Sequence, residues 1–248
     1  MRHILIAVTI VFLFSCNSSG KKGKGEAKAE EVVIAPAVLT AGQIPAAISV
    51  KGELNEAWQW TDRAGENILI TFYVKPYDDK EKNEYGEEGQ TAELHAAHYV
   101  RSGDQYNLIW TNDDGEKACP FDITCEFIKG GTTITDLDKD GMAETTIQYR
   151  LACRSDVSPA EMKLVMHEGS AKYMLKGLSW LRSSPEDNFT VTEKDANLET
   201  LQGYKRSEDE YMKTFGRYES EKEFEKAPPE FLDHARKQWM KFVIERME

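Results

Sequence analysis

The chain has 248 residues, of which 43 are Asp or Glu and 31 are Lys or Arg, and its formal net charge is −12 at pH 7. This length suits one domain of moderate size, with or without an appendage. Nucleic-acid binding requires a basic footprint, so the acidic excess argues against a nucleic-acid partner. It is compatible with calcium binding and with a protein of the cell envelope.

Residues 1–15 have the layout of a bacterial signal peptide. Arg2 supplies the positive charge, and residues 4–14 form an apolar run that is too short to span a bilayer. The sequence Leu-Phe-Ser-Cys that ends at Cys16 resembles the bacterial lipobox. This resemblance implies cleavage before Cys16 and acylation of its thiol. An ordinary secretory signal, with Cys16 incidental, is the alternative.

The lipid anchor and a tether are expected to occupy residues 16–31. This stretch is rich in Ser, Gly, Lys, Ala and Glu, a composition typical of a flexible linker. Asn17, by analogy with the sorting of enterobacterial lipoproteins, would not retain the protein in the inner membrane. We therefore expect a protein bound to the membrane through its N-terminal lipid, in the outer membrane of a Gram-negative cell envelope.

Residues 32–190 are expected to form a β-rich domain. Apolar residues alternate at 68–74 and again at 94–100, which is the period of a strand with one face on a core. His95 and His98 lie in the second of these segments, where their spacing places them on opposite faces of a strand. We expect His98 in the core and His95 at the surface, with neither acting as a metal ligand.

Turn signals in the same domain predict antiparallel pairing. Ser102-Gly103-Asp104-Gln105 separates two alternating segments and predicts a hairpin, and Glu168-Gly169-Ser170 predicts another. Residues 76–89 are rich in Asp and Glu and predict a solvated loop. Strands joined in this way would build a mostly antiparallel, sandwich-like sheet.

Residues 191–248 change to the period of helices. Ser207 followed by Glu210 is a capping-box pattern and predicts a helix, and Pro228-Pro229 suits the start of a last helix. The last helix would carry an apolar stripe made of Phe231, Leu232, Ala235, Trp239, Phe242, Val243 and Met247. We expect this stripe to pack on the sheet of the same domain, a partner-binding surface being the alternative. The predicted fold is α+β, with about seven to ten strands and one or two C-terminal helices.

The sequence Asp-Leu-Asp-Lys-Asp-Gly-Met-Ala-Glu at residues 136–144 has the pattern of an oxygen cage for a hard cation. So many carboxylates in so short a segment repel one another unless a divalent ion lies among them. Calcium accepts six to eight oxygens in flexible geometry and is favoured over magnesium. The expected ligands are the side chains of Asp136, Asp138, Asp140 and Glu144 and the backbone carbonyl of Met142. The alternative is a solvated acidic turn.

The loop differs from an EF-hand. That motif needs a bidentate glutamate at its twelfth position, which here is Ile147, and the residues after Glu144 have the pattern of a strand. The loop resembles the D-x-D-x-D-G-x-x-[D/E] calcium loops between strands in FG-GAP and VCBS-type repeats, although only one copy is present. We expect the ion to have a structural role and not a catalytic one.

Three cysteines follow Cys16 in the chain. Cys119 and Cys125 would lie up to ~20 Å apart if the residues between them are extended, and a disulfide requires Cα atoms within about 4.4–6.8 Å. Cys125 also falls on the apolar face of its strand, where a buried free thiol fits. This leaves a disulfide between Cys119 and Cys153 or, as the alternative, three free thiols. Their sequence context does not predict a nucleophilic cysteine.

Several short blocks resemble a family of Bacteroidota envelope lipoproteins that carries the loose label "surface polysaccharide biosynthesis protein". The blocks are Trp60-Thr61-Asp62 with Gly65 and Asn67, Cys119-Pro120-Phe121-Asp122, Thr135-Asp136-Leu137-Asp138, Tyr149-Arg150 and Cys153-Arg154-Ser155-Asp156-Val157-Ser158-Pro159. The resemblance implies an antiparallel β-rich fold with the calcium-type loop, and its label implies a link to surface glycans. It brings no catalytic residues.

Arg150, Arg154 and Asp156 form the polar cluster nearest to the loop in sequence. Such side chains could contact a glycan, with Trp60, Trp110 or Trp180 as stacking platforms. A structural salt bridge and ordinary core tryptophans are the preferred alternative.

These observations favour a non-enzymatic, lipid-anchored envelope protein with a structural calcium loop. It would serve as a binding or assembly factor linked to surface polysaccharide, with a glycan or an envelope protein as partner. One alternative is a subunit that binds a partner through its C-terminal helices. The other is a carbohydrate-active enzyme, which would need two carboxylates facing each other across a cleft.

Overall fold

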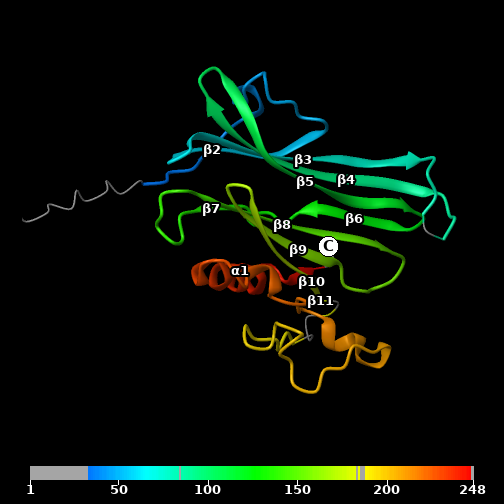
Figure 1. Ribbon diagram of the computed structural model, residues 1–248. Helices are drawn as coiled ribbons and strands as arrows, with labels where there is room; N and C mark the ends of the chain where they lie inside the picture. The colour runs from blue at the N-terminus through cyan, green and yellow to red at the C-terminus, as the bar shows by residue number, and fades with distance from the viewer. Residues whose placement is uncertain (1–32, 84, 183, 185–187, 247–248) are drawn as a thin grey trace, which may run out of the picture. The chain divides into compact units, whose positions relative to one another are not determined.

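A computed structural model of the chain describes residues 33–248, with the exception of 84, 183, 185–187, 247 and 248. The predicted signal peptide, the predicted lipidation site Cys16 and the predicted tether lie outside the described residues, as does Met247. Two antiparallel sheets and a C-terminal helix make up most of the described chain, so the α+β prediction is confirmed (Figure 1).

The first sheet is an antiparallel meander in the order β1-β2-β3-β4-β5. Its strands are β1 (Ala37–Val38), β2 (Glu53–Asp62), β3 (Gly65–Asp79), β4 (Gly89–Ser102) and β5 (Gln105–Cys119). The hairpin predicted at Gly103 is confirmed, because Ser102 pairs with Gln105 across it. The predicted loop at residues 76–89 is shorter than expected, since β3 resumes its pairing with β4 after a bulge and reaches Asp79.

The second sheet has the order β10-β9-β8-β6, and β7 pairs with the start of β8. Its strands are β6 (Asp122–Phe127), β7 (Thr133–Thr135), β8 (Glu144–Arg154), β9 (Glu161–Glu168) and β10 (Ala171–Leu178). A short parallel pair joins β11 (Trp180–Arg182) to β12 (Ile244–Arg246). The described residues contain more strands than predicted, because strands of two or three residues leave no periodicity in the sequence.

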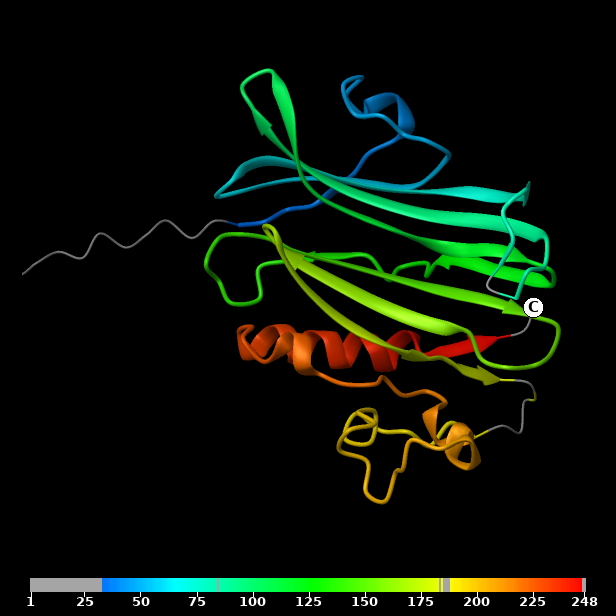
Figure 2. The ribbon, with the colours of Figure 1, turned by 45° about the vertical axis from the view of Figure 1, so that its right-hand side comes forward.

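The two sheets pack face to face (Figure 2). Leu69 and Leu94 of the first sheet lie in one buried cluster with Ile147 and Val165 of the second. His98 also points into this space and is only 4% exposed. These contacts confirm the sandwich predicted from alternation, because successive residues of a strand point to opposite faces.

His95 lies on the opposite face of β4, where its ring stacks on Phe72 with centroids 4.9 Å apart. Phe72 belongs to a second cluster, in which residues of the N-terminal segment cover the outer face of the first sheet, among them Leu39 and Ile48. Strand β3 is therefore apolar on both faces. The predicted opposite orientation of His95 and His98 is confirmed.

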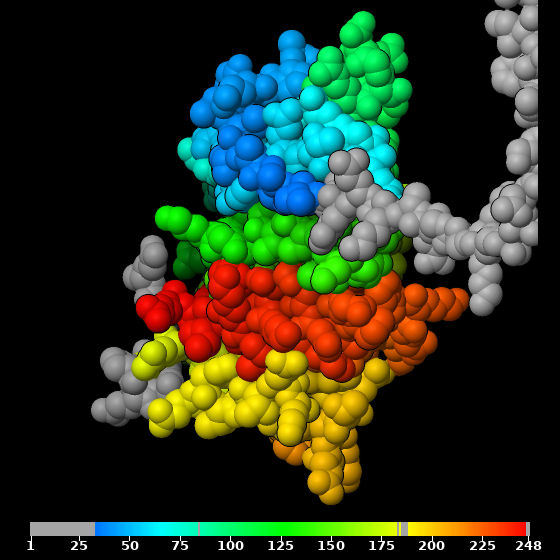
Figure 3. All heavy atoms as spheres, turned by 90° about the vertical axis from the view of Figure 1, so that its left-hand side faces the viewer, coloured from blue at the N-terminus to red at the C-terminus, as the bar shows by residue number. Residues whose placement is uncertain are grey.

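The C-terminal segment covers the outer face of the second sheet. Its helix α1 (Pro229–Phe242) begins at the predicted proline, whose fixed φ and missing N–H suit the first helical turn. Phe231, Ala235 and Trp239 are fully buried against residues of β9 and β10. In Figure 3 the red and orange atoms of this segment lie directly against the green atoms of the sandwich, with its yellow atoms on the other side of the red ones. The apolar stripe of α1 therefore packs within the chain.

The helix predicted after Ser207 is a 3-10 helix, η2 (Glu208–Thr214), and not an α-helix. The Ser207 side chain makes no capping hydrogen bond. The Glu210 carboxylate accepts from the backbone N–H of Lys205, outside the expected box. Gly216, with φ of 77°, turns the chain two residues after η2 ends. Two shorter 3-10 helices, η1 (Ala41–Gln43) and η3 (Lys222–Phe224), complete the helical elements of the described residues.

None of the helices in the part of the chain that the structure describes is long and apolar enough to cross a membrane.

Candidate metal centre

The acidic loop joins β7 to β8. Thr135 at the end of β7 pairs with Glu144 at the start of β8, so the chain must reverse within the loop. Lys139 and Gly141 adopt left-handed backbone conformations, with φ of 61° and 86°, which make this reversal sharp. Because Thr135 and Glu144 are paired in the sheet, the two strand ends that flank the loop are held together.

Each aspartate of the loop uses one carboxylate oxygen to hold the backbone. Oδ1 of Asp136 accepts a hydrogen bond from the N–H of Gly141 (3.4 Å). Oδ1 of Asp138 accepts one from the N–H of Asp140 (3.2 Å), and Oδ1 of Asp140 accepts one from the N–H of Met142 (2.7 Å). These bonds are made within the loop and hold its backbone in shape, and each uses one of the two oxygens of its carboxylate.

Glu144 is the buried member of the loop, with none of its surface exposed. Its Oε2 accepts from the backbone N–H of Leu137 (2.8 Å) and from the hydroxyl of Thr135 (3.1 Å), whereas Oε1 has no partner among the described residues. Burial, together with the charge of Asp138, raises the pKa of Glu144 to about 7. A buried carboxylate oxygen without a partner is costly, and a cation would satisfy it.

The carboxylates form two groups in which one oxygen from each member lies within 4.8 Å of the others. One group contains Asp136, Asp138 and Glu144, and the other contains Asp138, Asp140 and Glu168. Three of the four predicted carboxylates, those of Asp136, Asp138 and Glu144, therefore lie together, whereas Asp140 is grouped with Asp138 and Glu168. These groups consist of side chains alone, so the carbonyl contribution of Met142 stays a prediction.

Glu168 is a member of the site that the sequence reasoning missed. It is the last residue of β9 and lies directly opposite Glu144 in the β8–β9 ladder. Burial and the charges of Asp138, Asp140 and Asp136 raise its pKa. One feature of the sequence could have indicated Glu168. The turn predicted at Gly169 places Glu168 at the end of a strand, and this strand end lies beside the start of β8.

The loop is also fastened to the first sheet. The backbone N–H of Arg63 donates to the carbonyl of Gly141 (2.9 Å), and the N–H of Ala143 donates to Oδ2 of Asp62 (3.2 Å). Asp62 and Arg63 lie at the turn between β2 and β3. A cation in the loop would therefore stiffen a junction between the two sheets.

The donor set fits a hard divalent cation. All five side chains of the two groups offer carboxylate oxygens, which suit calcium, magnesium or manganese better than softer metals. The arrangement is a candidate cation site by its donors, burial and geometry.

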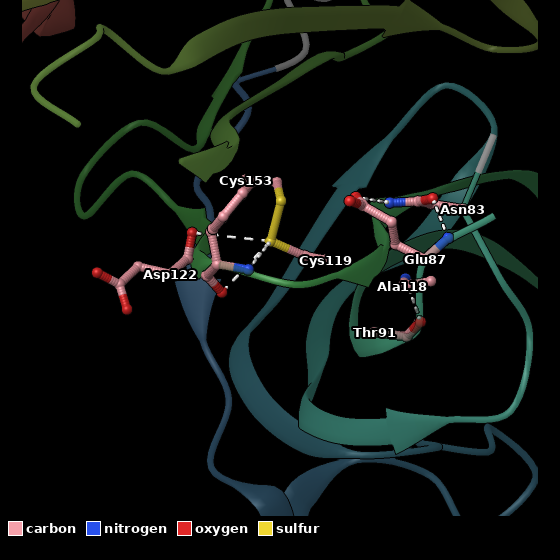
Figure 4. The surroundings of a disulfide bond; sticks show 8 residues. Asn83, Glu87, Thr91, Ala118, Cys119, Asp122 and Cys153 are labelled. Atoms are coloured by element: carbon pink, nitrogen blue, oxygen red, sulfur yellow. Dashed lines mark hydrogen bonds between the residues drawn. A yellow bond between two sulfur atoms is a disulfide. The ribbon is translucent and has the colours of Figure 1, made fainter. Parts of the chain in front are cut away.

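Cys119 and Cys153 form a disulfide, as predicted, with their Cα atoms 5.6 Å apart (Figure 4). Cys119 ends β5 in the first sheet and Cys153 lies near the end of β8 in the second, so the bond joins the sheets covalently. The N–H of Phe121 points at Cys119 Sγ, 3.4 Å away.

Cys125 is a free, half-buried thiol, and burial raises its pKa to about 12, which makes it a poor nucleophile.

The predicted polar cluster has structural partners. Arg150 donates to the carbonyls of Phe242 (2.6 Å) and Ile244 (3.0 Å), and Arg154 pairs with Glu245 of β12. Asp156 accepts from the backbone N–H of Ser158 (3.0 Å). These contacts match the structural alternative for the two arginines, and a glycan contact by this cluster stays a prediction.

The tryptophans do not form an exposed platform. Trp60 and Trp110 are buried between the sheets, 2% and 7% exposed, where they stack on His98 and His167. Trp180 is half-buried and meets Phe189 edge to face.

Fold and site together define an antiparallel β-sandwich with an acidic loop that is a candidate cation site and with a disulfide between its sheets. Comparison with protein-family models, with curated proteins and with solved structures finds no match for this chain.

Proposed function

We propose that this chain is a non-enzymatic, lipid-anchored protein of the cell envelope whose β-sandwich is stabilised by calcium in the loop at residues 136–144. The observation that carries the proposal is Glu144, a fully buried carboxylate with an unpartnered oxygen beside two aspartates. Calcium is favoured over magnesium because it accepts many carboxylate oxygens directly, whereas magnesium keeps much of its water shell.

A structural role for the ion is supported by where the loop is fastened. Its backbone is bonded to the β2–β3 turn on one side and continues into β8 on the other. An ion there would neutralise the repulsion among the carboxylates and hold both sheets at one end of the sandwich. The ion would then stabilise the fold by binding its native state, whereas the disulfide acts mainly by restricting the unfolded chain.

Placement in the envelope rests on the lipobox-like sequence at Cys16 and on the disulfide, because such bonds persist outside the cytoplasm. The resemblance to the Bacteroidota lipoprotein family adds a link to surface polysaccharide. A binding or assembly role, with a glycan or an envelope protein as partner, follows from that resemblance. A partner bound through the C-terminal helices remains the alternative, although the apolar stripe of α1 is already covered.

Calorimetric titration of the purified protein with calcium tests the proposal. We expect saturable binding to the wild type, and loss of binding in Glu144→Gln, which keeps the size of the side chain and removes its charge. The matched control is Glu208→Gln, an exposed glutamate of η2, which should bind calcium as the wild type does. Equal binding by Glu144→Gln and the wild type, or no binding by either, would refute the calcium site.

A further inference from the structure

Five carboxylates lie in two overlapping groups where β8 starts and β9 ends. They belong to Asp136, Asp138, Asp140, Glu144 and Glu168. Within the described part of the chain, no ion pair involves any of the five. Among the described residues, neutral N–H and O–H donors contact this cluster, but no positively charged group is paired with it.

Glu168 is the member of the cluster that comes from a different hairpin. Its Oε1 is inaccessible to solvent and has no hydrogen-bond partner among the described residues, the same condition as Oε1 of Glu144. The two glutamates are also directly opposite each other in the β8–β9 ladder. Like charges in that position destabilise a sheet, so the pairing needs a compensating charge between or beside them.

Asp138 connects the two carboxylate groups, because it belongs to both. One of its oxygens accepts from the N–H of Asp140 within the loop. Its carboxylate lies within reach of Glu144 on one side and of Glu168 on the other. The group of carboxylates is thus continuous from the loop to the end of β9.

We propose that Glu168 is a ligand of the bound cation, together with Asp138 and Asp140, so that the metal site extends from the loop to the β9–β10 hairpin. This inference rests on the proposed calcium function of the loop and adds a ligand that the linear motif does not contain. Gly169, with φ of 52°, forms the hairpin turn directly after Glu168. Cation binding would therefore fix this turn as well as the loop.

The test compares Glu168→Gln with the wild type in calcium and in chelator. In chelator we expect the variant to melt at the same temperature as the wild type or higher, because it removes one of the repelling charges. In calcium we expect it to melt lower, with a calcium dissociation constant raised on the order of 10- to 100-fold, as for loss of a group that supports a metal site. The change in melting temperature relative to the wild type would thus be zero or positive in chelator and negative in calcium if Glu168 is a ligand. Loss of a purely structural glutamate would lower the melting temperature equally in both conditions.

Glu161→Gln is the matched control, since Glu161 begins the same strand and pairs with Lys163 and Lys176 away from the loop. Its calcium-dependent gain in melting temperature should equal that of the wild type. Hydrogen exchange supplies a second readout, in which calcium should protect the amides of residues 169–171 in the wild type and not in Glu168→Gln.

Unchanged calcium affinity in Glu168→Gln would overturn the inference, as would an equal loss of stability with and without calcium. Asp138→Ala separates this failure from that of the proposed function. If Asp138→Ala abolishes calcium binding while Glu168→Gln leaves it intact, the loop binds calcium without the hairpin. If Asp138→Ala also binds calcium normally, the calcium function itself fails.

Discussion

Acidification from pH 7 to pH 4 should remove several kcal/mol of stability that two buried histidines contribute. His98 and His167 are each 4% exposed, and burial lowers the pKa of both to about 4. The unfolded chain would protonate them near pH 6.5 and therefore binds more protons than the folded chain between pH 6.5 and 4. Stability from these groups is thus complete above pH 6.5 and falls as the pH drops, by about 3 kcal/mol for each histidine.

The contribution of one histidine is isolated by His167→Phe. Its ring stacks on Trp110 with centroids 4.0 Å apart, and a phenyl ring can occupy the same place without a titrating group. Urea unfolding in chelator, at intervals from pH 7 to pH 4.5, measures the free energy of unfolding of both proteins. As the pH falls, we expect the free energy of unfolding to decrease less in the variant than in the wild type. The difference should be about 1.4 kcal/mol for each pH unit. Parallel pH profiles would show that His167 is not held neutral in the fold.

Removal of the disulfide should lower the free energy of unfolding by about 4 kcal/mol. The bond joins residues 34 apart in sequence, and closing a loop of this length restricts the unfolded chain by about that amount. It also ties the end of β5 in one sheet to β8 in the other. The double variant Cys119→Ala/Cys153→Ala should therefore unfold at a distinctly lower urea concentration than the wild type.

Cys125→Ala serves as the control, because Cys125 is a free thiol between the same two cysteines. A reducing agent should shift the wild type toward the double variant and leave the double variant unchanged. If the reduced and the oxidised wild type unfold at the same urea concentration, the disulfide does not stabilise the fold.

Strand periodicity was sufficient to predict the sandwich. In β4, for example, alternation placed His98 in the core and His95 on the other face, and the structure agrees. The same reasoning could not find β7, β11 or β12, which are too short to show a period. At Ser207 the local pattern predicted a helix, but its side chain makes no cap and the segment forms a 3-10 turn instead.

The candidate site was predictable where its ligands are neighbours in sequence. The carboxylates of Asp136, Asp138 and Glu144 lie together as the motif requires, because the loop itself sets their spacing. Glu168 was missed because its place depends on the register of two strands. The hydrogen-bond partners of Arg150 could not be predicted either, because the carbonyls of Phe242 and Ile244 are more than 90 residues away in sequence.

Thermal unfolding of the wild type and of Asp138→Ala, each in calcium and in chelator, decides whether the loop holds a stabilising ion. A ligand that binds only the native state stabilises it by about 2.7 kcal/mol at a hundredfold excess over its dissociation constant. We predict a melting temperature that rises with calcium in the wild type and stays constant in Asp138→Ala. Identical melts of the wild type with and without calcium would contradict a structural calcium site.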